Sequence, residues 1–175
     1  MSSPEPHRQK PHRHPRFGSV RGFTLVEILV VVVIISLLAM VAIPGVQIVQ
    51  RRAKSSAIVN DFRVFATAFE TYAQEKGAFP AEAAVGDIPV GMEAYLKSDA
   101  WKRTTPMGGH YNWEKDQLHG GPIKAAVAIT GTADAPLPYD VNLLLDIDKA
   151  IDDGNPLTGN FRLGVEMCPL FVIER

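Results

Sequence analysis

A single carboxylate stands inside the most hydrophobic stretch of this chain. Residues 23–43 are 21 in number, and only Glu27 among them is charged. Inserting a carboxylate within a membrane-spanning helix costs about 2.5–3.5 kcal/mol, so its presence requires a reason. Two interpretations are open: Glu27 lies near the interface and reaches headgroup water, or it meets a positively charged partner.

A second group of oxygen-bearing side chains lies near the C-terminus. Asp148, Asp152, Asp153 and Asn155 fall within eight residues, and carboxylate and amide oxygens are ligands that Ca²⁺ prefers. Their order does not match an EF-hand loop. The group is therefore either a calcium site or an acidic helix end that faces solvent.

Neither group is a catalytic arrangement. The sequence has no serine-hydrolase elbow, no zinc-protease motif, no phosphate-binding loop and no paired cysteines. We therefore predict no catalytic residue and no enzyme activity. Cys168 is the only cysteine, which excludes a disulfide within the chain. It is interpreted as a small buried apolar residue, with an intermolecular bridge or a reactive thiol as the alternative.

The element that positions Glu27 is a helix. At about 1.5 Å per residue, residues 23–43 span roughly 30 Å, the thickness of a bilayer core. Apolar residues lie all round this helix, which suits lipid better than a one-sided core.

Charge predicts the orientation of this helix. Residues 1–22 carry a net charge of +4 with four prolines, so we expect a disordered basic segment that stays cytoplasmic while the C-terminal part crosses the membrane. Residues 23–175 carry a net charge of −5 and give no electrostatic basis for binding nucleic acid.

The helix is predicted to continue as an amphipathic segment to Lys76, where Gly77 ends it. Pro44 and Gly45 are expected to kink or locally melt it, because proline removes a backbone hydrogen bond. A kink at these residues would mark the point where the helix leaves the membrane. A stripe at helical spacing is predicted to pack on a sheet. It consists of Ile58, Phe62, Phe65, Phe69 and Tyr72.

The remaining chain is predicted to be α+β. Strand patterns occupy residues 110–114, 123–129, 160–165 and 170–174. Short helices are expected at residues 92–97 and 140–153, the second capped by Asp140. The expected buried face of that second helix is Val141, Leu144, Ile147 and Ile151.

The N-terminal residues resemble a known family. Residues 21–27 read Arg-Gly-Phe-Thr-Leu-Val-Glu and are followed by the apolar run and Pro44. This pattern is similar to the class III signal of type IV prepilins and type II secretion pseudopilins. The resemblance implies a pilin-like fold, in which a long N-terminal helix packs on a small antiparallel sheet with an additional short helix.

The resemblance also implies a processing and assembly pathway. A prepilin peptidase would cut between Gly22 and Phe23 and N-methylate Phe23, and Glu27 would then pair with the Phe23 amine of a neighbouring subunit. The implied partners are this peptidase, identical or homologous pilin-like subunits, an inner-membrane assembly platform and membrane lipid. The implied location is the bacterial inner membrane, with the N-terminus cytoplasmic and the C-terminal part periplasmic, followed by the pilus or pseudopilus.

The sequence thus predicts a filament subunit of a type IV pilus or a secretion pseudopilus. The alternative is a minor pilin-like adaptor that is tethered to the membrane and never polymerises. Four segments are expected. They are a leader at residues 1–22, a spanning and filament-core helix at 23–43, its amphipathic continuation at 44–76, and a globular head at 77–175.

Overall fold

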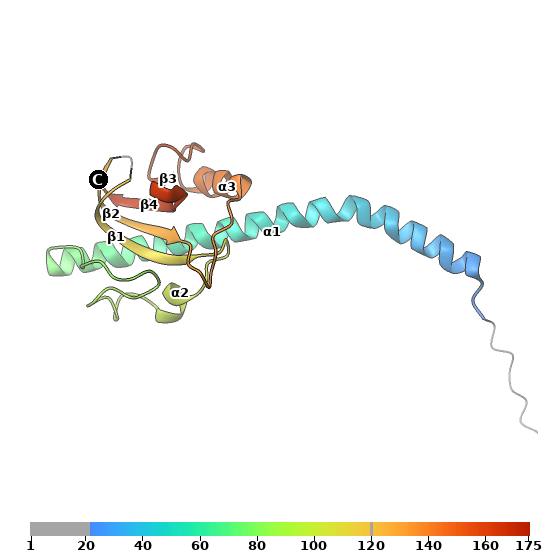
Figure 1. Ribbon diagram of the computed structural model, residues 1–175, viewed down its shortest axis with the longest axis horizontal. Coiled ribbons are helices and arrows are strands. Elements are labelled where there is room, and N and C mark those ends of the chain that lie inside the picture. The colour runs from blue at the N-terminus through green and yellow to red at the C-terminus, as the bar shows by residue number, and fades with distance from the viewer. Residues whose placement is uncertain (1–21, 120) are drawn as a thin grey trace, which may run out of the picture. The chain divides into compact units, whose positions relative to one another are not determined.

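The computed structural model describes residues 22–119 and 121–175, and one long helix dominates it. Helix α1 runs from Leu25 to Lys76 (Figure 1). It begins after Thr24, whose Oγ1 accepts a hydrogen bond from the Glu27 amide at 3.2 Å, as a capping hydroxyl does. It ends at Gly77, which has a φ of 80°. The predicted end of the helix is confirmed.

Contacts divide the chain into two units, Met1–Ala42 and Ile43–Arg175. In the first unit, the described part of α1 has no cover. Its large apolar side chains between Leu25 and Val41 are 47–91% exposed. Within the described residues, α1 is the helix long and apolar enough to cross a membrane.

In the second unit, the C-terminal half of α1 packs on a four-stranded antiparallel sheet (Figure 1). The strand order is β1-β2-β4-β3. The strands are β1 (His110–Leu118), β2 (Pro122–Thr130), β3 (Phe161–Leu163) and β4 (Pro169–Glu174). All four predicted strands are present. β1 extends four residues further than its pattern indicated, because Lys115, Gln117 and Leu118 stay paired with β2. β3 is shorter than the predicted residues 160–165, because Val165–Met167 form a short 3-10 helix.

The core forms where the predicted aromatic stripe of α1 meets the sheet. Phe69 stacks on Trp113 of β1 with ring centroids 3.8 Å apart and nearly parallel planes. Phe65 meets Tyr111 and Trp101 edge-on, at 4.8 Å and 5.0 Å. Helical spacing put these rings on one face, and burying each contributes about 1.5–3 kcal/mol. The predicted packing of the stripe is confirmed.

Two short helices flank the second half of α1 on opposite sides (Figure 1). Helix α2 spans Ser98–Lys102, so the helix expected at residues 92–97 is wrong. Those residues form turns in which the Tyr95 and Leu96 amides donate to the Met92 carbonyl. Met92 and Leu96 are both buried. Because they are four residues apart, as on one face of a helix, the sequence pattern suggested a helix where the chain forms turns.

Helix α3 spans Val141–Ile151, and Asp140 caps it by accepting from the amides of Asn142 and Leu143. Its predicted buried face is partly wrong. Val141 is 51% exposed, while Leu143 and Asp148 are buried beside Leu144. The face is rotated because α3 also packs toward β3.

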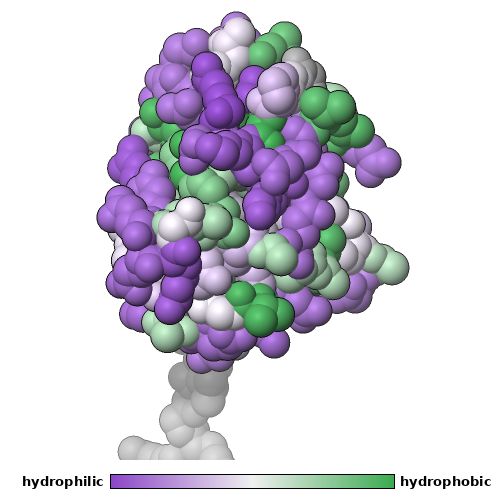
Figure 2. All heavy atoms as spheres, turned by 90° about the vertical axis from the view of Figure 1, so that its left-hand side faces the viewer, coloured by the Kyte–Doolittle hydropathy of each residue, from purple (hydrophilic) through white to green (hydrophobic). Residues whose placement is uncertain are grey.

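The end of the head that carries Lys76 is predominantly hydrophilic (Figure 2). Hydrophobic residues appear there as scattered patches between polar ones. Such a surface suits contact with water and with polar partners. This end of the head therefore differs in kind from the uncovered apolar part of α1.

Candidate functional site

The N-terminal processing motif lies open to approach. Phe23 is 76% exposed, and nothing described lies within 4 Å of where a Cβ on Gly22 would stand. Both residues precede the first turn of α1. Residues 1–21 of the predicted leader lie outside the described residues. A peptidase cleft could therefore reach the Gly22–Phe23 bond without unfolding a helix.

Glu27 lies in the first turn of α1. Its amide is capped by Thr24, but its carboxylate forms no hydrogen bond or ion pair with residues 22–119 or 121–175. A carboxylate near a helix N-terminus interacts favourably with the exposed amides there. The structure thus presents an acid at the start of an apolar rod, with no described partner.

Another carboxylate of α1, Asp61, has two partners within the chain, and both contact its Oδ2 atom. It is 8% exposed, accepts a hydrogen bond from Tyr111 Oη at 2.6 Å, and forms an ion pair with Arg103. Burial, and then the hydrogen bond to Asp61, raise the pKa of Tyr111 well above its usual range. The sequence analysis missed this cluster, because its members lie 42 and 50 residues apart and form no local pattern.

Pro44 and Gly45 lie inside α1, and the helix is continuous through both. Local melting at these residues is not seen in this structure. Proline leaves only the carbonyl four residues earlier without its amide, and a helix can continue on either side. A bend at these residues stays a prediction.

The predicted calcium ligands lie at the end of α3 and in the turn after it. Asp148 is completely buried, and neither of its carboxylate oxygens has a hydrogen-bond partner. Burial, and then the charges of Asp153 and Asp152, raise its pKa. The Gly154 amide has the smallest influence and lowers this pKa, although its geometry falls short of a hydrogen bond. A buried carboxylate without a partner is costly and favours a proton or a cation beside it.

The other three candidates shape the turn rather than point at Asp148. Asp152 accepts from the Asn160 amide, and Asp153 accepts from the Asn155 amide at 2.8 Å and from Thr158 Oγ1 at 3.0 Å. Asn155 Oδ1 accepts from the Leu157 amide at 3.3 Å. In the described part of the chain, no three His, Cys, Asp or Glu side chains are already spaced to hold a metal. The donor set fits calcium chemically, and calcium binding stays a prediction.

Cys168 is half-buried and free, and burial raises the pKa of its thiol. A raised pKa keeps the thiol protonated and unreactive near neutral pH. Cys168 is thus less buried than the sequence analysis expected, and the raised pKa of its thiol argues against the reactive-thiol alternative.

Comparisons with known proteins match both the N-terminal motif and the fold of this chain. The model of the "Prokaryotic N-terminal methylation motif" matches residues 18–43. The chain is 34% identical over 97 residues to a type II secretion system core protein G of Pseudomonas aeruginosa, covering 54% of this chain and 59% of that protein. It is 31% identical over 114 residues to the core protein G of Klebsiella michiganensis, covering 60% of this chain and 80% of that protein.

A solved structure is similar in fold. The major type IV pilin of Clostridium difficile superposes with a TM-score of 0.50, over 71% of this chain and 97% of that one. The two are 19% identical, so this likeness concerns the fold alone. The predicted architecture of a long helix on an antiparallel sheet is confirmed.

Proposed function

This chain belongs to the family of type IV pilins and type II secretion pseudopilins, and we propose that it is a structural subunit of a secretion pseudopilus. Members of this family are structural proteins and not enzymes. The secretion assignment is supported by the two core protein G relatives. The pilin likeness supports the fold that both kinds of filament use.

One observation carries the filament role: among the described residues, nothing covers the apolar half of α1 and nothing pairs with its carboxylate, Glu27. A plain membrane anchor would gain nothing from Glu27, because an unpaired charge only raises the cost of insertion. A filament of parallel helices gains from it, because a cation on the neighbouring subunit can neutralise it. Hydrophobic contacts between helices supply most of the adhesion, and the charge pair selects the register.

The cation is the amine that processing creates. Prepilin peptidase would cut the exposed Gly22–Phe23 bond and N-methylate Phe23. Glu27 lies four residues further, or ~6 Å along the helix. A neighbour displaced by about this distance brings its Phe23 amine level with Glu27. At ~4 Å and an effective dielectric constant near 20, the gross attraction is about 4 kcal/mol.

The membrane is the starting point of assembly. The basic leader would hold the N-terminus in the cytoplasm, and the head would reach the periplasm. The inner-membrane assembly platform would then move subunits from lipid into the filament. The helix exchanges lipid contacts for helix contacts of similar apolarity, so the transfer needs little net free energy from burial.

The test of this function uses three measurements on cells that carry the whole machine. N-terminal mass spectrometry is expected to find N-methyl-Phe23 as the first residue. Glu27→Leu is expected to be inserted and processed, yet to yield less than about a tenth of the sheared filaments, a loss of ~1.4 kcal/mol or more per subunit. Glu70→Leu, which changes an exposed carboxylate in the second half of α1 that forms no ion pair with the described residues, is the matched control.

Two outcomes contradict the proposal. One is a mature protein that retains its leader in filament-forming cells. The other is a Glu27→Leu variant that assembles as well as the control. A wild-type chain that is processed but absent from sheared filaments would instead support the tethered adaptor.

We further propose that the turn after α3 binds calcium. The support is Asp148, a buried carboxylate whose oxygens have no partner in the described chain. Asp148, Asp152, Asp153 and Asn155 would hold the ion after a rearrangement of the turn. Calcium would supply the positive charge that this turn lacks and would fix it against the head.

A further inference from the structure

Between the apolar rod and the head, α1 has a short basic segment. We call residues 44–54 the neck. It contains Arg51, Arg52 and Lys54 and no acid. Arg51 is engaged with Asp146 of α3 at 2.7 Å, whereas Arg52 and Lys54 are exposed and form no ion pair with any described residue.

The two free cations lie on different sides of the neck. Residues two apart on a helix are separated by about 200° around its axis, so Arg52 and Lys54 point in nearly opposite directions. Arg52 precedes Arg63 by eleven residues, close to three full turns, and Arg63 donates to the Ala150 carbonyl of α3 at 2.9 Å. The side of α1 that carries Arg52 is therefore the side that faces α3.

Lys54 shares its side with Asp61, seven residues later and almost two full turns away. Asp61 binds Arg103, which directly follows α2. The Lys54 side is therefore the side that faces α2. This distinction is useful, because α2 and α3 lie on opposite sides of α1 (Figure 1).

The Arg52 side is also apolar. Ile48 and Val49, one turn before Arg52, are 42% and 67% exposed. Apolar surface next to an unpaired guanidinium is typical of a protein contact, where an arginine combines stem packing with paired hydrogen bonds. Nothing described in the chain covers this face.

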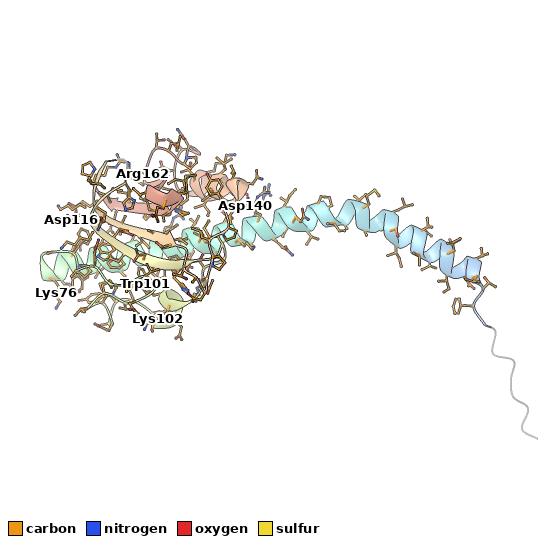
Figure 3. All side chains as sticks on the ribbon, in the orientation of Figure 1. Lys76, Trp101, Lys102, Asp116, Asp140 and Arg162 are labelled. Carbon is orange, nitrogen blue, oxygen red and sulfur yellow. The ribbon has the colours of Figure 1, made fainter. Side chains whose placement is uncertain are left out.

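An acid-lined cleft lies on the α2 side of the head. Its volume is about 600 Å³, and it lies between the loop after Gly77 and α2. Its charged residues are Glu82, Asp87, Glu93 and Lys102. Figure 3 shows Lys102 on α2, on the side of α1 away from Asp140 of α3.

The cleft carries acidic side chains without ion-pair partners among the described residues, and a hydrogen bond holds its rim in place. Asp87 and Glu93 are exposed and form no ion pair among the described residues, whereas Glu82 accepts from Gln117 and the Lys115 amide. The Trp101 indole donates to the Asp87 carbonyl at 2.8 Å, which fixes the rim. Val90, 83% exposed, adds an apolar surface beside the acids.

We propose that, in the filament, the neck of one subunit docks its Arg52 side into the acid-lined cleft of a second copy, with Arg52 between Asp87 and Glu93. The inference rests on the proposed filament function. A helical filament requires a heterologous contact, in which two different surfaces of the same chain meet. The Arg52 side and the cleft lie on opposite sides of α1, match in charge, and each carry exposed apolar residues.

Anionic lipid phosphates are the competing partner for the neck. Variants on the two sides of the helix distinguish lipid binding from docking into a second subunit. Lipid headgroups surround the helix, so they would contact Arg52 and Lys54 alike. A subunit contact through the cleft uses Arg52 and leaves Lys54 free. Lys54→Glu is therefore a matched control with the same change of charge on the same exposed segment.

The experiment is a charge swap in the full chain, measured as sheared filaments per cell. Arg52→Glu and Glu93→Arg are each expected to lower the yield about tenfold, because each places like charges in contact. Lys54→Glu is expected to stay within about twofold of wild type. The double variant Arg52→Glu/Glu93→Arg is expected to recover to within about threefold, because the pair is restored with its signs exchanged.

The outcomes are decisive in both directions. Arg52→Glu yields equal to those of Lys54→Glu, or a double variant no better than its parents, overturn the docking proposal. If Glu93→Arg lowers the head's own unfolding midpoint, Asp87→Arg replaces it. Glu27→Leu in the same assay separates the two hypotheses. If that variant fails while Arg52→Glu assembles normally, only the docking is wrong; if wild type forms no filaments, the proposed function is wrong.

Discussion

Glu27 in the first half of α1 and Asp61 in the second half both lie among apolar side chains, but they differ in whether another side chain pairs with the carboxylate. Asp61, in the half that packs on the sheet, has Arg103 and Tyr111 as partners within the chain. Glu27, in the uncovered half, has no side-chain partner among residues 22–119 and 121–175. The same helix therefore contains a satisfied carboxylate and an unsatisfied one.

The apolar side chains of the two halves differ in the same way. Phe62 and Phe69 are completely buried against the sheet, whereas Leu25 is 91% and Leu29 64% exposed. Apolar burial is the main favourable term in folding. The second half of α1 obtains it inside the chain, and the first half must obtain it from lipid or from other subunits. Under the proposed function, one part of the helix would stabilise the folded head and the other part would stabilise the filament.

The largest expected effect tests this separation through the core. Phe69→Ala removes the ring that stacks on Trp113 and should lower the free energy of unfolding of the head by ~3–5 kcal/mol. Leu29→Ala should leave it within ~0.5 kcal/mol. Denaturant unfolding of the detergent-solubilised chain, followed by tryptophan fluorescence, measures both. Equal losses in the two variants would show that the halves of α1 are energetically coupled.

The two acids give the next largest effect. Asp61→Ala leaves the buried Tyr111 hydroxyl and the Arg103 guanidinium without their acceptor and should destabilise the head by ~2–4 kcal/mol. Glu27→Gln should leave head stability unchanged and reduce assembly. A head that loses stability in Glu27→Gln, or keeps it in Asp61→Ala, contradicts the comparison. The measurement is the same unfolding curve, paired with filament yield.

Much of the difference between the buried and the exposed halves of α1 could be predicted from the sequence, because it depends on local patterns. The spacing of Phe62, Phe65 and Phe69 defined the buried face, Gly77 marked the end of the helix, and the G-F-T-L-V-E segment with its apolar run indicated the processing site. These features reside in neighbouring residues. Helical periodicity and capping chemistry therefore suffice to find them.

Contacts between distant residues could not be predicted in this way. Asp61, Arg103 and Tyr111 meet only because the sheet folds over α1, and no local pattern links them. The helix at residues 92–97 was mispredicted because Met92 and Leu96 are buried four residues apart in a turn. The burial of Asp148 ran against the rule that acids face solvent, and it depends on the packing of α3 toward β3, which no local pattern shows.

Asp148 provides a pH-dependent test of intermediate size. Its pKa is raised above the ordinary 3.8, so the folded head holds a proton that the unfolded chain releases. Stability from this group is fully present below about pH 4 and is lost as the pH rises through the raised value. Without calcium, Asp148→Asn should therefore unfold with a flatter pH profile and be more stable than wild type at neutral pH, by ~1–3 kcal/mol.

Calcium should make wild type more stable than Asp148→Asn at neutral pH. In millimolar Ca²⁺, wild type should gain thermal stability at neutral pH and Asp148→Asn should not, because the ion replaces the missing proton. Asp99→Asn, on the exposed surface of α2, is the matched control and should respond like wild type. Thermal unfolding in calcium and in chelator measures this. A wild-type curve that is identical in both would remove the calcium site and leave the pH effect in place.

The smallest expected effect lies at the junction between the two halves. Arg51 of the neck pairs with Asp146 of α3 at 2.7 Å, and both side chains are about 30% exposed. Such a pair contributes ~0.2–1 kcal/mol and is weakened by salt. Arg51→Gln should lower head stability by that amount at low salt and by less at 1 M salt, and a double-mutant cycle with Asp146→Asn isolates the coupling. A much larger coupling would mean that the neck belongs energetically to the head, and that an Arg52 variant could weaken filaments by loosening its own subunit. A coupling energy within the expected range would mean that the neck contributes little to the stability of its own head. A loss of filaments in an Arg52 variant would then report a lost contact with a neighbouring subunit.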